Sequence, residues 1–124
     1  MSRPKKVLVI DDSASVRQQV THALIEAGFD VVEAVDGVDG VEKIDRNHDL
    51  AAVLCDVNMP RMNGLEVVEK VRQGGKNAHL PILMLTTEGN PTLIQRAKQA
   101  GAKGWIIKPF KTDLLVATVR KLAA

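Results

Sequence analysis

The apolar runs VLVI (residues 7–10) and AAVLC (residues 51–55) decide the fold, because each ends abruptly in acid, at Asp11 and Asp12 and at Asp56. Further apolar runs stand at residues 31–32, 82–85 and 105–107. Most of these runs are continuous rather than alternating, which is typical of strands buried on both faces of a parallel sheet. The sequence therefore predicts five strands.

Helical spacing fills the segments between these runs. Val16, Val20 and Leu24 recur at intervals of four residues and would form one apolar stripe on a first helix. Similar patterns predict four more helices around residues 38–44, 65–71, 93–97 and 115–122. Five strands that alternate with five helices imply an α/β domain with a mostly parallel sheet, because parallel neighbours need a crossover connection.

The residues at the expected helix ends agree with this division. Ser13 can cap the first helix and Asn90, before a proline, can open the fourth. Gly28 and Gly101 can end the first and fourth helices, and the glycines at residues 74–75 indicate a loop after the third. No linker, repeat or low-complexity segment interrupts the pattern, so we expect one structural unit.

Length and composition fit a single globular domain. The 124 residues are 45% hydrophobic and 26% charged, which is too apolar for a disordered chain. We expect one domain over residues 1–124, a monomer, with no output domain, since the chain ends right after the fifth helix. No apolar stretch is long enough for a membrane span or a secretory signal, so we expect a cytoplasmic protein.

The cysteine and histidine residues do not indicate a site. Cys55 is the only cysteine, which excludes an internal disulfide and favours a small buried hydrophobe over a nucleophile. His22, His48 and His79 lie outside the motifs described below, and we expect them at the surface.

The charges are distributed unevenly along the chain. The net charge of +2 is too small to indicate nucleic-acid binding. Residues 11–49, however, hold ten acidic and three basic residues, whereas residues 95–124 hold seven basic residues and one acidic residue. The basic segment is either a solvated surface or a docking face, and the sequence leaves both open.

The acidic residues after two apolar runs predict a metal site. In open α/β sheets the ligand lies beyond the carboxyl ends of the strands, where the strand order reverses. If the first and third strands are neighbours, Asp11, Asp12 and Asp56 converge, and three like charges require a cation such as Mg²⁺. The alternative is that Asp12 caps a helix and Asp56 is exposed in a loop.

Two further residues bear on the chemistry of such a site. A bound metal beside a free carboxylate can activate water, or the carboxylate can itself accept a phosphoryl group. Thr86 follows the fourth strand and Lys108 follows the fifth, so both should face the same edge of the sheet as the acids. A hydroxyl and an ammonium are the groups that bind phosphoryl oxygens, which favours the second chemistry over a structural Thr and an exposed Lys.

With these residues in view, the chain resembles the receiver domain of response regulators, and the CheY chemotaxis group in particular. The resemblance runs from about Lys5 to Leu122 and rests on four motifs, VLVIDDSASVR, LCDVNMPRMNGLE, PILMLTTE and GAKGWIIKPF. It implies a flavodoxin-like, doubly wound (βα)5 fold around a five-stranded parallel sheet. The strand order 2-1-3-4-5 is the known order of CheY, and the expectation comes from that resemblance.

The resemblance also assigns roles to the site residues. Asp56 would be the phosphorylated residue and, with Asp12 and the main-chain carbonyl of Asn58, a direct ligand of Mg²⁺. Asp11 would act on the metal mostly through bound water.

The resemblance also predicts which residues lie beside the phosphoryl group. Thr86 and Lys108 would contact it, and the Lys108–Pro109 bond is expected to be cis. Asn58 and Glu88 occupy the positions that flank the phosphoryl group and influence its lifetime, which we expect to be on the order of seconds to minutes.

Signal output in this family couples Thr86 to an aromatic residue of the fifth strand. That residue is Tyr in the best-studied members and Trp105 here, in a chain without any Tyr. An indole is larger than a phenol and donates a single N–H, so two behaviours remain open. Trp105 either swings behind Thr86 on activation or packs permanently against the fourth helix.

The family mechanism implies the partners. A CheA-like histidine kinase would donate the phosphoryl group, and the receiver would later hydrolyse it, so the chain would not be an enzyme in the usual sense. The face of the fourth helix, fifth strand and fifth helix would bind an acidic target, such as a flagellar motor switch component. Its expected contacts are Arg96, Lys98, Lys103 and Lys111. A phosphatase is a further expected partner, and nucleic acid and membrane are not.

Three other functions are alternatives to a chemotaxis regulator. A phosphorelay or phosphate-sink receiver for pilus, gliding or developmental signalling stays open, because residues near the site do not distinguish it. A Mg²⁺-dependent aspartyl-phosphate phosphatase typically has a second acid two residues after its nucleophile, where this chain has Asn58, and it needs a cap for which the chain lacks length. A nucleotide or flavin binder is disfavoured by the absence of glycine-rich phosphate motifs and by the acidic loop after the first strand.

Overall fold

The computed structural model describes residues 4–74 and 79–124, so Gly75 of the expected loop lies outside the described residues. Five parallel strands form one sheet in the order β2-β1-β3-β4-β5, which confirms the expected topology. The strands are β1 (Lys6–Ile10), β2 (Asp30–Ala34), β3 (Leu50–Cys55), β4 (Ile82–Thr86) and β5 (Gly104–Ile107). Each covers one of the predicted apolar runs.

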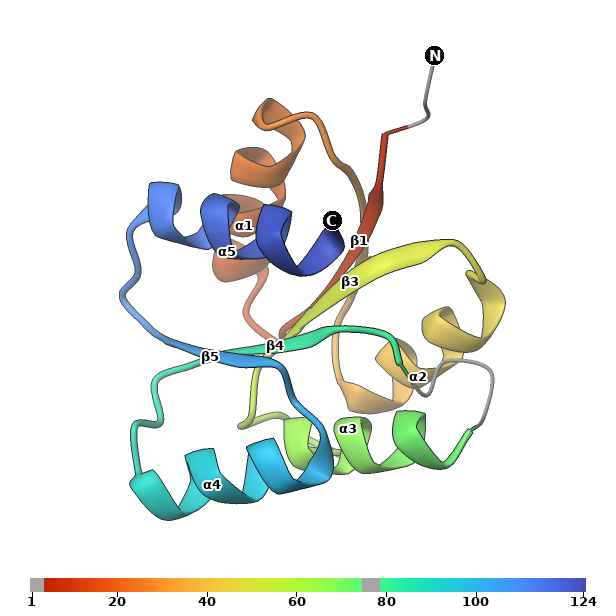
Figure 1. Cartoon of the computed structure of the whole chain (residues 1–124), viewed down its shortest axis with the longest axis vertical. Coiled ribbons are helices and arrows are strands. Elements are labelled where there is room, and N and C mark those ends of the chain that lie inside the picture. The colour runs from red at the N-terminus through yellow and green to blue at the C-terminus, as the bar shows by residue number, and fades with distance from the viewer. Residues whose placement is uncertain (1–3, 75–78) are drawn as a thin grey trace.

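Helices cover both faces of the sheet (Figure 1). They are α1 (Ala14–Glu26), α2 (Gly37–Arg46), α3 (Gly64–Gln73), α4 (Pro91–Ala100) and α5 (Thr112–Ala123). Helices α1 and α5 lie on one face, and α2, α3 and α4 lie on the other. Val7 and Val9 of β1 contact the first layer, while Leu8 and Ile10 contact the second. This two-sided burial is the physical reason why the strands read as continuous apolar runs.

The predicted helix ends are confirmed. The side chain of Ser13 accepts a hydrogen bond from the N–H of Val16, and Asn90 caps α4 in the same way from Thr92. Gly101 ends α4 in the left-handed conformation with φ 112°. Gly28, with φ 96°, directly follows Ala27, the C-cap residue of α1. Local side-chain chemistry thus fixes where these helices begin and end.

The strand register brings the site residues to one edge. Ile10 of β1 pairs with Cys55 of β3, so the residues that follow them leave the sheet side by side. The N–H of Asp56 donates to the carbonyl of Ile10 at 3.0 Å. At the other end of the edge, Thr86 of β4 pairs with Ile107 of β5. Because all strands are parallel, their carboxyl ends meet at the same edge.

Several smaller expectations are also confirmed. Cys55 is fully buried, and burial raises the pKa of its thiol, so it behaves as a small hydrophobe. His22, His48 and His79 are exposed. Within residues 4–74 and 79–124, none of the helices has the length and apolar character needed to cross a membrane.

Candidate metal and phosphoryl site

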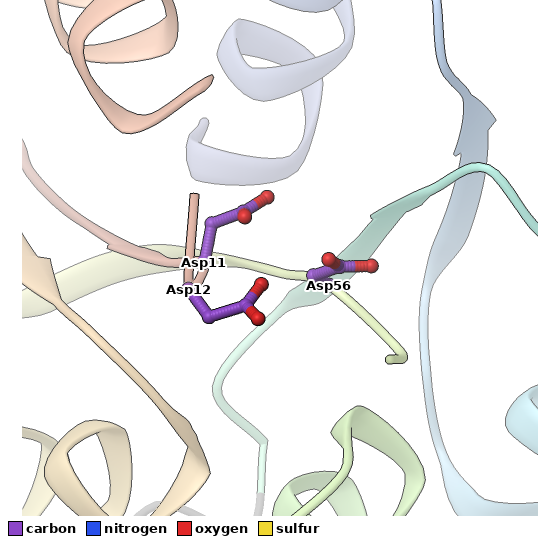
Figure 2. Close-up of side chains that lie close together, drawn as sticks. All are labelled: Asp11, Asp12 and Asp56. Carbon is purple, nitrogen blue, oxygen red and sulfur yellow. The ribbon is translucent and has the colours of Figure 1, made fainter. Parts of the chain in front are cut away.

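Three carboxylates converge at the carboxyl edge of the sheet (Figure 2). Asp11 and Asp12 follow β1, Asp56 follows β3, and one carboxylate oxygen from each lies within 4.8 Å of the other two. Asp11 and Asp56 are buried, at 2% and 7% exposure, and Asp12 is exposed. The alternative in which Asp12 caps a helix and Asp56 sits exposed in a loop is therefore wrong, because Ser13 caps α1 and Asp56 is buried.

Gly64 allows the phosphoryl-acceptor candidate to sit against helix α3. A Cβ atom added at Gly64 would lie 2.2 Å from the main-chain oxygen of Asp56, closer than any real contact. The N–H of Gly64 also donates to the carbonyl of Val57 at 2.9 Å. Glycine is required here by a close backbone approach rather than by an unusual φ angle.

Lys108 lies across the acidic cluster. Its ammonium is 2.7 Å from a carboxylate oxygen of Asp11 and 3.4 Å from one of Asp56. The Lys108–Pro109 peptide bond is cis, as expected. When the three carboxylates are ionised, one ammonium leaves two negative charges uncompensated, which is the charge that a divalent cation supplies.

The electrostatics of Asp11 fit a cation site. Burial raises the pKa of Asp11, although hydrogen bonds from Lys108 and from the N–H of Ser13 act in the opposite direction. The ionised form is therefore under-stabilised in the protein alone. Among the residues that the structure describes, no hydrogen bond or ion pair engages the Asp12 carboxylate, which leaves it available as a ligand. Carboxylate oxygens are the ligands that Mg²⁺ prefers.

Thr86 lies at the same edge and is fully buried. Its hydroxyl oxygen accepts a hydrogen bond from the N–H of Glu88 at 3.2 Å. Its carbonyl accepts from the N–H of Lys108 at 2.8 Å, which joins the ends of β4 and β5. A hydroxyl can accept and donate at once, so its hydrogen remains free for another acceptor.

Glu88 contacts both Asn58, predicted to influence the phosphoryl lifetime, and Trp105, predicted to take part in signal output. Its carboxylate accepts a hydrogen bond from the side-chain amide of Asn58 at 3.0 Å. Its main-chain carbonyl accepts from the indole N–H of Trp105 at 2.8 Å. Trp105 is half-buried and packs against the core on the side of α4, so its single donor is already used.

The four predicted partner-face residues are all exposed. Arg96 and Lys98 belong to α4, Lys103 lies between α4 and β5, and Lys111 is the N-cap of α5. In Figure 1, α4 and β5 lie on one side of the molecule and α2 lies on the other. All four predicted contacts are therefore accessible to a partner.

Sequence reasoning missed two arginines beside the site. Arg17 of α1 donates to the carbonyl of Asp11 at 2.6 Å, and Arg61 pairs with the buried Asp36 at 2.6 Å. Neither residue continues an apolar pattern or a known ligand spacing. The one available signal was positional, because Arg61 lies within the segment that links Asp56 to α3.

Comparison with known proteins identifies the family. The family model of the response regulator receiver domain matches residues 7–120. The chain belongs to this family. This receiver domain is 42% identical over 111 residues to the chemotaxis protein CheY1 of Helicobacter pylori, and the match covers 89% of this chain and 90% of that protein. It is thus a CheY-like receiver of two-component signalling, a signalling protein rather than a classical enzyme.

Two solved structures share its architecture. Vibrio cholerae CheY4 is 42% identical, superimposes with a TM-score of 0.90, and is matched over 96% of this chain and 98% of that one. CheY in the CheX–CheY–BeF3–Mg complex of Borrelia burgdorferi is 26% identical, with a TM-score of 0.91 and coverage of 98% and 90%. The latter relative was solved with Mg²⁺ and a beryllofluoride group.

Proposed function

We propose that this chain is a cytoplasmic chemotaxis response regulator that accepts a phosphoryl group on Asp56 from a histidine kinase. The observation that carries the proposal is the convergence of Asp11, Asp12 and Asp56 within 4.8 Å, with the Lys108 ammonium across them. The names of the relatives, which are chemotaxis proteins, support the pathway.

The residues that would hold Mg²⁺ are Asp12, Asp56 and the main-chain carbonyl of Asn58, with Asp11 beside them. When bound, the ion would supply positive charge that offsets the carboxylates and the phosphoryl oxygens. The under-stabilised charge of buried Asp11 and the unengaged carboxylate of Asp12 support this assignment.

The proposed transfer is an in-line substitution at phosphorus. A carboxylate oxygen of Asp56 attacks the phosphorus of a phosphohistidine, a P–O bond forms, and the P–N bond breaks with its electron pair going to the imidazole. Lys108 has three N–H donors, of which two face Asp11 and Asp56, so one remains for a phosphoryl oxygen. The free hydroxyl hydrogen of Thr86 would donate to another.

Reset would follow by hydrolysis of the acyl phosphate in place. Asn58 and Glu88 would flank the phosphoryl group, and their hydrogen bond of 3.0 Å joins the two loops beside Asp56. We propose a lifetime on the order of seconds to minutes for the aspartyl phosphate, on the basis of these two residue types. A phosphatase partner would shorten it.

Output would pass to the face formed by α4, β5 and α5. Its exposed cations, which include Arg96 and Lys98, would attract an acidic target such as a flagellar motor switch component, mainly by raising the association rate. Donation by the Thr86 hydroxyl to a phosphoryl oxygen would alter its bond with Glu88, whose carbonyl holds the Trp105 indole. Phosphorylation would therefore change the surroundings of Trp105 through Glu88.

The test uses Trp105, the only tryptophan, as a fluorescent reporter. The wild-type protein, Asp56→Asn and the control Asp45→Asn, an exposed aspartate on α2, would be titrated with Mg²⁺ and then with beryllofluoride. Wild type and the control should respond, whereas Asp56→Asn should lose the beryllofluoride response and all hydroxylamine-labile phosphorylation by the small donor acetyl phosphate. A beryllofluoride response that survives in Asp56→Asn would overturn the assignment.

A further inference from the structure

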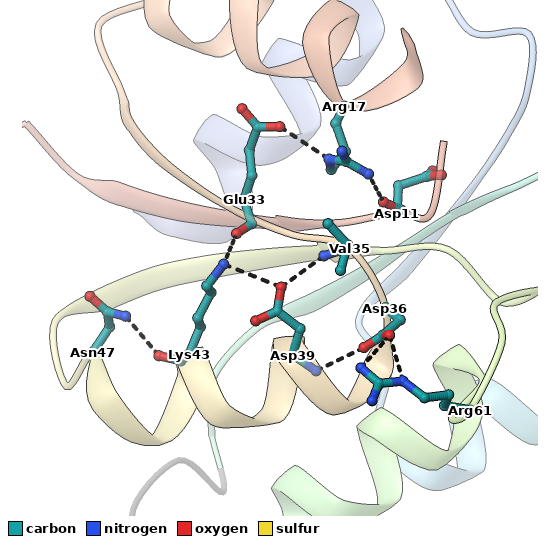
Figure 3. Close-up of polar contacts among 9 residues, drawn as sticks. All are labelled: Asp11, Arg17, Glu33, Val35, Asp36, Asp39, Lys43, Asn47 and Arg61. Carbon is teal, nitrogen blue, oxygen red and sulfur yellow. Dashed lines mark hydrogen bonds and ion pairs between the residues drawn. The ribbon is translucent and has the colours of Figure 1, made fainter. Parts of the chain in front are cut away.

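The β3–α3 loop, residues 56–63, is held at its outer end by an ion pair. The guanidinium of Arg61 donates from Nε at 2.8 Å and from a terminal nitrogen at 2.6 Å to the same carboxylate oxygen of Asp36 (Figure 3). The Asp36 side chain is 8% exposed, although that of Arg61 is 61% exposed. A fork of two charge-assisted hydrogen bonds onto a buried carboxylate is stronger and better oriented than an ordinary surface pair.

The backbone of Arg61 adopts a conformation that its side chain does not favour. Its φ angle is 68°, in the left-handed region that residues with a Cβ rarely adopt. It is the only non-glycine residue with positive φ in the described part of the chain. Unfavourable backbone geometry persists where surrounding contacts hold it, and the contact at this residue is the pair with Asp36.

Asp36 itself is fixed by helix α2. Its second oxygen accepts a hydrogen bond from the N–H of Asp39 at 2.9 Å, so the carboxylate caps the helix with one oxygen and binds Arg61 with the other. The bond from the Asp39 N–H, followed by Arg61, lowers the pKa of Asp36. The same carboxylate therefore caps α2 and accepts from Arg61, and both contacts favour its ionised form.

A steric contact accompanies the ion pair. A Cβ atom added at Gly37 would lie 2.3 Å from the main-chain oxygen of Met62. The first residue of α2 and the residue after Arg61 are thus in direct backbone proximity. Together, Asp36, Gly37, Arg61 and Met62 form a contact between α2 and the β3–α3 loop that we call the loop clamp.

The same helix is tied to the other side of the metal site. A carboxylate oxygen of Asp39 accepts from the Lys43 ammonium at 3.2 Å, and Lys43 also donates to the carbonyl of Glu33 (Figure 3). The Glu33 carboxylate pairs with Arg17 at 3.2 Å, and Arg17 donates to the carbonyl of Asp11. The loop clamp therefore attaches the β3–α3 loop to α2, which is linked through Glu33 and Arg17 to the backbone of Asp11.

We propose that Arg61 is a positioning residue, which acts through Asp36 to hold the β3–α3 loop so that the main-chain carbonyl of Asn58 faces the metal. This inference rests on the proposed function. Arg61 contacts neither the acidic cluster nor any group of the phosphoryl site among the described residues. Its effect is exerted on the backbone between Asn58 and Gly64.

The variants that test this keep the rest of the structure intact. Arg61→Asn removes the cation, and asparagine tolerates the left-handed conformation better than most residues. Asp36→Asn keeps an oxygen to cap α2 but removes the charge and presents an amide to Arg61. The matched control is Arg46→Asn, an exposed arginine in the last turn of the same helix.

The first readout uses the protein without metal. Amide hydrogen exchange should accelerate at Met62 and Gly64, whose N–H groups donate to the carbonyls of Pro60 and Val57, while amides of β1 and α4 keep their wild-type rates. The second readout is the Mg²⁺ dissociation constant from Trp105 fluorescence or calorimetry. Each single variant should bind Mg²⁺ about tenfold more weakly, the lower range for residues that orient ligands.

The double variant Asp36→Asn/Arg61→Asn tests whether the two residues act as one unit. It should bind Mg²⁺ no more weakly than either single variant, and Arg46→Asn should match the wild type. Unchanged Mg²⁺ affinity in Arg61→Asn, additive losses in the double variant, or exchange that accelerates equally throughout the chain would each overturn the proposal. Failure of the wild type to bind Mg²⁺ would instead count against the proposed function.

Discussion

The two loops that border the site are held in different ways. The β3–α3 loop is fixed to α2 by the Arg61–Asp36 ion pair and to α3 by the close approach of Gly64 to Asp56. In the β4–α4 loop, residues 87–90, Asn90 caps α4, and Glu88 takes part in three further hydrogen bonds. The contacts of the β3–α3 loop are with α2 and α3, whereas the bonds of Glu88 are with Thr86, Asn58 and Trp105.

This difference indicates different tasks for the two loops. The contacts of the β3–α3 loop with α2 and α3 use no side-chain group of the proposed phosphoryl site. The bond between the Thr86 hydroxyl and the Glu88 N–H does use one, because that hydroxyl is the proposed phosphoryl contact. We expect a rigid β3–α3 loop that positions ligands and a β4–α4 loop whose bonds change with phosphorylation.

The largest expected effect tests the rigid side of this comparison. Gly64→Ala would place a Cβ atom 2.2 Å from the main-chain oxygen of Asp56, and backbone atoms cannot move away cheaply. We expect a loss of about 1–3 kcal/mol in the free energy of unfolding, the usual range for overpacking. Urea denaturation followed by circular dichroism measures it.

A matched glycine provides the control for this substitution. Gly74→Ala, at the other end of α3, would bring Cβ no closer than 3.4 Å to a neighbouring atom, and its φ of −79° suits alanine. Its stability should stay close to that of the wild type. Equal stability of Gly64→Ala and Gly74→Ala would mean that the β3–α3 loop yields readily and is not rigid.

A smaller effect on the free energy of unfolding is expected from substitutions that affect the β4–α4 loop. Trp105→Phe removes the hydrogen bond to the Glu88 carbonyl, a loss of about 0.5–1.5 kcal/mol, and should accelerate hydrogen exchange in the β4–α4 loop. Glu88→Ala removes only the contact with Asn58 and keeps the main-chain bonds to Thr86 and Trp105. It should cost less than Trp105→Phe in urea denaturation. The reverse order would show that the Asn58 contact, not the indole, holds this loop.

The smallest effect concerns pH and the loop clamp. Hydrogen bonding from the Asp39 N–H, together with Arg61, lowers the pKa of Asp36 below its ordinary value of 3.8. The native state therefore binds fewer protons than the unfolded state near this pH, and the contribution of Asp36 is complete above the ordinary pKa. This stabilising contribution of Asp36 decreases as the pH falls below the ordinary value of 3.8 and is gone once the pH is below the lowered pKa of the native state.

Comparison with Asp36→Asn isolates this contribution. Urea midpoints measured between neutral pH and about pH 3 should fall less steeply in the variant than in the wild type. Parallel curves would indicate that Asp36 titrates alike in the native and unfolded states, and that the clamp contributes no electrostatic stability.

Much of the fold followed from local sequence signals. Strands such as residues 82–86 are buried on both faces, so their apolar runs are continuous and easily read. Ser13, Asn90 and Gly101 act on neighbouring backbone groups, and short-range chemistry of this kind can be recognised in one dimension. The Asn63–Glu66 capping box of α3 carried the same kind of signal and was overlooked.

The sequence by itself determined the fold class and placed the acidic residues, Thr86 and Lys108 at strand ends, because the parallel arrangement sends every strand end to one edge. Only the tertiary structure decided how Arg61 reaches Asp36, 25 residues away in the chain, and where the single donor of Trp105 is used. Side-chain pairing between distant segments depends on backbone distances set by packing of the whole domain, which no local pattern in the sequence records.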